Sequence, residues 1–231
     1  MTLDRRFVIL RSHTEIKLSH MRTKTLLLTA ALCAAGAATS MAQVYSVNMV
    51  GYINQSIPAG FSMIANQLNN SPDNRIASLF PAPADQTRIY KFNGAGFTIA
   101  EYADGEWNPA GLTETLAPGE GAYIFAPAAF THTFVGEVAL TSAVNLPPGF
   151  SMIGSTLPQS LPLTGTPPAG LGYPIGDGDK IYRFDGVGFI ISEFADGEWN
   201  TPIPTPNIGE GFYAFNNGAA KSWNRTFSVG P

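Results

Sequence analysis

Beyond residue 43, apolar and polar positions follow the two-residue period of β-strands rather than the 3.6-residue period of helices. In residues 89–92, 97–100 and 122–125, aromatic or large apolar residues alternate with their neighbours. Asn-Gly and Asp-Gly pairs stand between such runs, and these pairs favour hairpin turns because both residues accept positive φ. The chain has 24 glycines and 18 prolines without a collagen-like period. The pattern therefore predicts an all-β protein of short antiparallel strands.

The predicted strands occur twice. Three segments of one half match three of the other in the same order: IPAGFSMI with LPPGFSMI, IYKFNGAGF with IYRFDGVGF, and GEGAYIF with GEGFYAF. The spacing differs only across Pro-rich stretches, which we interpret as loops. We expect two repeated units of about five strands each, barrel- or sandwich-like. They would span 57–138 and 146–231, with 139–145 as a linker.

A Val-Gly pair marks a strand type that recurs outside these segments. It stands at Val50-Gly51, at Val135-Gly136 and at Val229-Gly230. We therefore expect an N-terminal strand within residues 43–56 and a C-terminal strand within 222–229. Pairing between these two strands would close the structure and remove exposed edges.

The start of the chain has the pattern of an export signal. Two cationic residues follow Met21, an apolar run begins at Leu26, and small residues stand at Ser40 and Ala42. The apolar run is too short to span a bilayer. We expect residues 21–42 to be a cleaved signal peptide, which predicts a secreted or periplasmic protein.

The predicted cleavage has further consequences. Residues 1–20 would be an extended or untranslated leader, and Cys33 would leave with the signal. The mature chain would start near Gln43 without an integral membrane segment, a disulfide or a thiolate nucleophile. His132 would be its only histidine, so no His-based metal cluster or Ser-His pair can form. We expect His132 to be a surface strand residue.

Charge narrows the range of partners. From Gln43 onward the chain has 7 Lys and Arg against 15 Asp and Glu, which gives a net charge of −8. An acidic surface of this kind repels phosphate backbones and anionic lipid. We therefore expect no nucleic-acid partner.

The hexapeptide ADGEWN occurs twice, at 103–108 and 195–200. Its Asp-Gly pair fits a hairpin turn, and its tryptophan fits a packing residue of the next strand. Its acids could instead bind calcium, as could the acids of the segment GDGDK, because hard cations prefer spaced oxygen donors. The candidate calcium ligands are Asp104, Glu106, Asp196, Glu198, Asp177 and Asp179.

Two further uses of these segments remain open. Asp104 and Glu106 could act as the acid and base of a hydrolase, although perturbed carboxylates need burial and a duplicated active site would be unusual in so small a chain. The aromatic residues could stack on sugar rings, although such residues in strands more often fill cores. The candidate sugar-stacking residues are Trp107, Trp199, Tyr90 and Tyr182, together with Tyr123 and Tyr213.

The segments VYSVNMVGY, GFSMI, IYKFNGAGF, GEWN and APGEGAYIF resemble a family of uncharacterised exported proteins found in Verrucomicrobia and related bacteria. The resemblance covers almost the whole mature chain. It implies no activity, cofactor or catalytic residue. We therefore expect a non-catalytic structural or interaction module of the bacterial envelope or extracellular space, with a glycan or an envelope protein as partner. A carbohydrate- or calcium-binding module is the alternative, and a hydrolase comes last.

Overall fold

The computed structural model describes residues 49–228, which lie within one compact unit. Almost all of its regular structure is antiparallel β-sheet, as the sequence predicted. Within this range, no helix has the length and apolarity needed to cross a bilayer. The expected signal peptide, the leader and Gln43 lie outside the described residues.

The first repeat consists of a five-stranded sheet and a two-stranded ribbon. The sheet has the order β2-β6-β3-β4-β5, and the ribbon pairs β1 with β7. Isoleucines of the ribbon and of the sheet share one buried core, so the repeat has two layers. Its elements are β1 (Val50–Ile57), β2 (Gly60–Ala65), α2 (Ile76–Leu79), β3 (Arg88–Phe92), β4 (Phe97–Ala103), β5 (Glu106–Trp107), α3 (Pro109–Thr113), β6 (Gly121–Ala126) and β7 (Phe130–Glu137).

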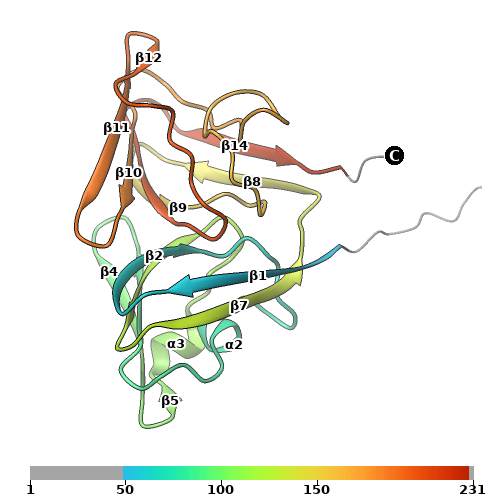
Figure 1. The fold of residues 1–231 in the computed structure, drawn as a ribbon, viewed down its shortest axis with the longest axis vertical. Coiled ribbons are helices and arrows are strands. Elements are labelled where there is room, and N and C mark those ends of the chain that lie inside the picture. Colours follow the sequence, from blue (N-terminus) through green and yellow to red (C-terminus); the bar gives the residue numbers. More distant parts are fainter. Residues whose placement is uncertain (1–48, 229–231) are drawn as a thin grey trace, which may run out of the picture. The chain divides into compact units, whose positions relative to one another are not determined.

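The second repeat has the same topology. Its sheet has the order β12-β11-β10-β13-β9, and its ribbon pairs β14 with β8. Figure 1 shows the two ribbons, with β1 beside β7 and β8 beside β14. Its strands are β8 (Thr141–Leu146), β9 (Gly149–Ile153), β10 (Lys180–Phe184), β11 (Phe189–Ala195), β12 (Glu198–Trp199), β13 (Phe212–Asn216) and β14 (Lys221–Thr226). Two similar all-β units are therefore confirmed.

The expected pairing of the two terminal strands is wrong. Each strand pairs within its own repeat. The chain turns at Pro58 between β1 and β2, and these two strands pair with β7 and β6 respectively. Gly51 and Gly136 are direct partners in the first ribbon. A Cβ on Gly136 would lie 2.5 Å from the carbonyl oxygen of Asn69, so this Val-Gly pair makes room for a crossing backbone. The third pair, Val229-Gly230, lies outside the described residues.

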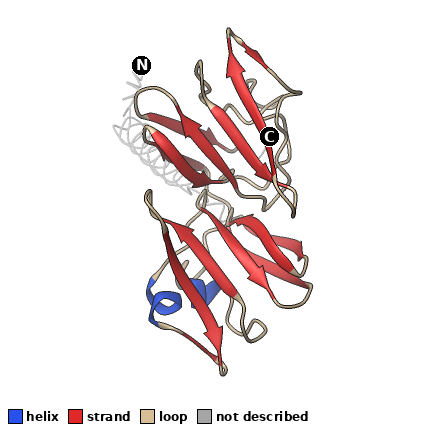
Figure 2. Ribbon diagram, turned by 90° about the vertical axis from the view of Figure 1, so that its left-hand side faces the viewer, coloured by secondary structure: helices blue, strands red, loops and turns tan. Residues whose placement is uncertain are grey.

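Two boundaries also differ from the prediction. Residues 141–145, expected to be linker, form most of β8 and pair with β14. Two Pro-rich stretches of the first repeat, expected to be loops, contain α2 and α3. The second repeat has no helix among its described residues, and Figure 2 shows both helices in the same half of the molecule.

Asn108 caps α3 by accepting a 3.0 Å hydrogen bond from the backbone N–H of Gly111.

The repeated GEG segment joins the two repeats. The Ala65 amide donates to the Gly209 carbonyl at 2.8 Å, and the Gly154 amide of the second repeat donates to the Gly119 carbonyl at 3.0 Å. A Cβ on Gly211 would lie 2.4 Å from the carbonyl oxygen of Ile64. Equivalent residues thus make the same contact in both directions, which relates the repeats by a pseudo-twofold axis.

Candidate binding face

The outer faces of the two five-stranded sheets carry rows of aromatic side chains. Strand alternation places Ile64, Ile89 and Ile124 in the core, so the residues between them point outward. We call the large outward residues of β2, β3, β4 and β6 and their counterparts the aromatic face. They are Phe61, Met63, Arg88, Tyr90, Phe92, Phe97, Ile99, Glu101, Tyr123 and Phe125, with Phe150, Met152, Lys180, Tyr182, Phe184, Phe189, Ile191, Glu193, Tyr213 and Phe215.

The aromatic face is continuous across the two repeats. The ring centroids of Phe92 and Tyr213 lie 5.5 Å apart, and those of the equivalent pair Phe184 and Tyr123 lie 5.8 Å apart. Both pairs are edge to face, which is a favourable arrangement for aromatic quadrupoles. Each repeat therefore continues the aromatic rows of the other around the pseudo-twofold axis.

Much of this apolar surface is open to solvent. Phe61, Phe97, Phe150 and Phe189 are each 42–45% exposed. Five face residues also line a hollow of about 370 Å³: Phe61, Tyr90, Phe97, Tyr123 and Phe184. A contiguous exposed apolar patch marks an interaction surface, because apolar side chains are otherwise buried in the core.

Charges and hydroxyl groups give the aromatic face a polar rim. Arg88 pairs with Glu101 at 2.8 Å, and Lys180 pairs with Glu193 at 3.5 Å in the equivalent row. Each pair is neutral as a unit. Burial raises the pKa of Tyr213, and the nearby Tyr123 raises it further. The Tyr213 hydroxyl therefore keeps its proton at neutral pH and can donate a hydrogen bond.

The two repeats share more identical residues on the aromatic face than on the opposite face of the same strands. At its ten positions the repeats carry the same residue nine times, and the tenth exchanges Arg88 for Lys180. On the opposite face of the same strands only three of ten positions are identical: 62 with 151, 64 with 153, and 89 with 181. Exposed positions normally diverge more freely than buried ones, because packing does not constrain them. Contacts between the repeats account for Phe92 with Phe184 and for Tyr123 with Tyr213. The exposed pairs are also kept, although packing constrains them least: Phe61 with Phe150, Phe97 with Phe189, and Ile99 with Ile191.

The two hexapeptides form hairpin turns, as predicted. Asp104 and Gly105 have φ of 54° and 83° between β4 and β5, and the second copy repeats these angles. Both residues at positive φ define a type I′ turn. The Gly105 amide donates to Asp85 Oδ1 at 3.3 Å, so an upstream acid braces the turn.

Neither predicted tryptophan belongs to the aromatic face. Trp107 is 6% exposed in the core and donates its indole N–H to the Phe80 carbonyl at 2.8 Å. Trp199 is half-buried against the second core and donates to Thr164 Oγ1 at 3.2 Å. Of the six candidate sugar-stacking residues, the four tyrosines lie on the aromatic face: Tyr90, Tyr123, Tyr182 and Tyr213.

The candidate calcium ligands lie in separate environments. The acids of both hexapeptides are exposed on the hairpins: Asp104, Glu106, Asp196 and Glu198. Asp177 Oδ1 accepts from the Asp196 amide at 2.7 Å and braces the second turn. Asp179 is 1% exposed, forms an ion pair with Lys221 and accepts from the Asn217 amide at 2.9 Å. Within residues 49–228, no group of three or more His, Cys, Asp or Glu side chains is arranged to hold a metal.

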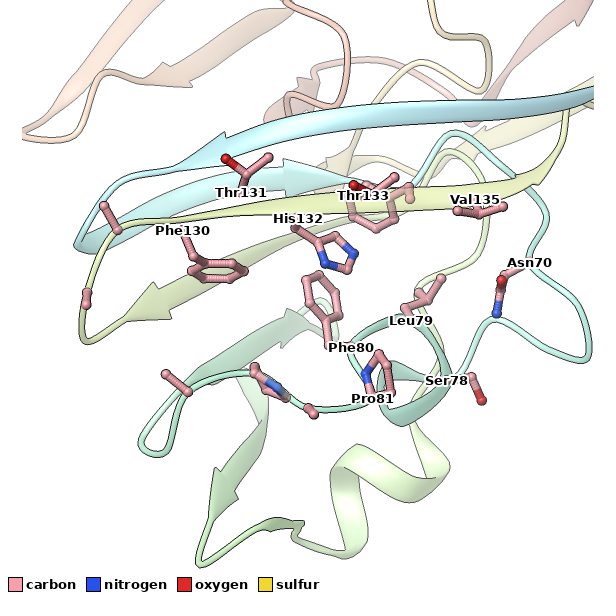
Figure 3. Close-up of a pocket in the computed structure, with 16 residues that line it drawn as sticks. Asn70, Ser78, Leu79, Phe80, Pro81, Phe130, Thr131, His132, Thr133 and Val135 are labelled. Carbon is pink, nitrogen blue, oxygen red and sulfur yellow. The ribbon is translucent and has the colours of Figure 1, made fainter.

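His132, expected to be a surface strand residue, lies in β7 and is half-buried beside a cleft. Its ring stacks on Phe80 with centroids 3.9 Å apart, and Nε2 is buried without a hydrogen-bond partner. Burial lowers its pKa to about 4, so the imidazole is neutral at pH 7. Figure 3 shows His132 and Phe80 between β7 and the segment after α2. The cleft that they line has a volume of about 580 Å³. The strand pattern gave no signal for this cleft, because the chain that covers it is distant in sequence.

Comparison with known proteins yields no relative. No family model, no curated protein and no solved structure matches the chain.

Proposed function

We propose that this protein is an exported, non-catalytic interaction module that binds an apolar segment of a partner protein through the aromatic face. The observation that carries the proposal is that the two repeats keep the same residues at the exposed positions of this face: Phe61 with Phe150, Phe97 with Phe189, and Ile99 with Ile191. The exposed phenylalanines supply the anchors that dominate binding energy in protein interfaces. The charged pairs at the rim would fix the orientation of the bound partner.

The geometry supports a protein partner better than a glycan. Stacking on a sugar needs a flat, open ring with polar groups at its edge. Here Phe61 is tilted by 53° against Tyr90, and Tyr90 stands at 86° to Phe97. Interlocked rings of this kind present edges and ridges, which suit apolar side chains of a protein.

A hydrolase receives less support from the same geometry. The acids proposed for its acid and base roles, Asp104 and Glu106, are exposed on a hairpin turn. A catalytic carboxylate with a raised pKa needs burial or a like-charged neighbour in a cleft. The turn explains the Asp and Gly residues without such a role.

A selection experiment tests the proposal. A phage-displayed peptide library and a glycan array are both probed with sparsely immobilised protein, so that molecules do not meet one another. We expect peptides rich in aromatic and aliphatic residues to bind, and Phe61→Ser with Phe150→Ser to abolish their binding. The control is Leu112→Ser with Ile203→Ser, which removes side chains of 52% and 44% exposure outside the aromatic face. Glycan binding that is lost in Tyr90→Ala would overturn the protein-partner assignment in favour of a carbohydrate module.

A further inference from the structure

We propose that the partner on the aromatic face is a second copy of this chain, in a face-to-face homodimer. This inference rests on the proposed function of the aromatic face and names its occupant. The first argument is symmetry. Interfaces of twofold dimers are self-complementary, so one surface must offer both members of every contact.

The aromatic face meets this requirement with knobs and a hollow. Its knobs are exposed rings such as Phe150 and Phe189, which are 45% and 42% exposed. Its hollow of about 370 Å³ is lined by aromatic side chains that include Phe61 and Phe184. A cavity of roughly 150 Å³ already accepts benzene, so the hollow has room for a phenyl ring of a second copy.

Charge is the second argument. The chain from residue 43 onward carries 15 acidic against 7 basic residues, so two copies repel over most of their surface. The aromatic face is the exception, because its charged residues are two basic and two acidic ones joined in ion pairs. The aromatic face is therefore the surface where two copies of this acidic chain meet with the least like-charge repulsion.

Area is the third argument. The four exposed phenylalanines and the two face isoleucines, Ile99 and Ile191, are 42–47% exposed. At about 200 Å² for each side chain they present roughly 500 Å² of apolar surface. A standard interface buries about 800 Å² per partner, a little over half of it apolar, so roughly 450 Å² suffices. The aromatic face therefore matches the demand of a stable dimer.

Sedimentation velocity over a range of protein concentrations tests the dimer. We expect the purified protein to sediment as a dimer in the micromolar range and Phe61→Ser with Phe150→Ser to weaken association at least about 100-fold. Leu112→Ser with Ile203→Ser should leave the dimer unchanged. A second variant, Ile99→Glu with Ile191→Glu, places like charges across the interface and should also give monomers. Circular dichroism checks that each variant is folded.

The outcomes separate this inference from the proposed function. A protein that stays monomeric up to about 200 µM would overturn the dimer. If such a monomer still selects peptides through Phe61 and Phe150, the interaction module stands and its partner is a different protein. A dimer that persists in both face variants would also overturn the inference, because another surface would then hold the copies together.

Discussion

The two faces of each five-stranded sheet behave in opposite ways when the repeats are compared. On the core face, neighbouring positions exchange size, with Ala122 and Ile124 replaced by Phe212 and Ala214. The core residues change while their total volume is kept. A packed interior tolerates such exchanges as long as the volume is conserved. On the aromatic face the residues themselves are kept. The difference indicates that the core is selected for filling space and the aromatic face for contacting something.

The ribbons show a second difference. Strand register makes His132 of β7 equivalent to Trp223 of β14. Trp223 is fully buried and donates to the Leu171 carbonyl at 2.8 Å, whereas His132 leaves one ring nitrogen unsatisfied beside a cleft. The core therefore covers the second ribbon at this position, whereas a cleft borders the first.

The largest expected effect lies in the core. Trp223→Ala should lower the free energy of unfolding by about 3 to 5 kcal/mol, because it removes a buried ring and leaves a cavity and an unpaired Leu171 carbonyl. Trp199→Ala should cost less, because Trp199 is only half-buried. Urea unfolding of both variants measures the difference. Equal losses would contradict the burial of the two rings described above.

The junction between the repeats should be the next most sensitive region. Gly211→Ala would place a Cβ 2.4 Å from the carbonyl oxygen of Ile64, and backbone cannot move aside cheaply. We expect a loss of about 2 to 3 kcal/mol in unfolding free energy. Gly96→Ala is the matched control, because its Cβ would meet no atom within 4 Å. If calorimetry finds the two variants equally stable, the close contact between Gly211 and the backbone of Ile64 does not hold the repeats together.

His132 should make the first ribbon sensitive to acid. Its pKa is lowered from 6.5 to about 4 in the folded state, so the unfolded chain binds the proton first as pH falls. The neutral imidazole contributes its stability above pH 6.5, and that stability is lost between pH 6.5 and about 4. From pH 7.5 to 5 the loss should be about 2 kcal/mol.

His132→Phe should reduce this acid sensitivity, because phenylalanine keeps the stack on Phe80 without a titrating group. Unfolding curves at several pH values, recorded for the parent and the variant, give the difference. Identical pH profiles would show that His132 is not the group responsible.

The smallest effect on stability should come from the aromatic face. Phe61→Ser and Phe150→Ser, measured in dilute protein, should each cost about 1 to 2 kcal/mol, because the rings are 44% and 45% exposed and only part of their area is buried. The same changes should abolish binding. A loss as large as that of Trp223→Ala would mean that the aromatic face is kept for stability instead.

The sequence predicts local features well and spatial ones less well. The Asp104-Gly105 turn follows from two adjacent residues, so its geometry was predictable. The start of α3 also had a local signal, because Asn108 followed by Pro109 is a typical helix N-terminus. That signal was missed because the stretch was interpreted only as a Pro-rich loop.

The sequence indicated the aromatic face only as an alternative to the core, for a physical reason. Both faces of these strands are apolar, with Ile89 on one side and Tyr90 on the other, so alternation does not say which side is the core. Large aromatics are usually buried, which favoured the wrong side. The pairing of β1 with β7 likewise depends on contacts between segments far apart in sequence.

Hydroxyl-radical footprinting across a range of protein concentrations tests the central claim most directly. We expect labelling of four phenylalanines in dilute protein and their joint protection as the concentration rises: Phe61, Phe97, Phe150 and Phe189. Leu112 and Ile203, which are exposed elsewhere, should be labelled throughout. Labelling of the four phenylalanines that stays the same at every concentration would contradict the claim that a second copy covers the aromatic face.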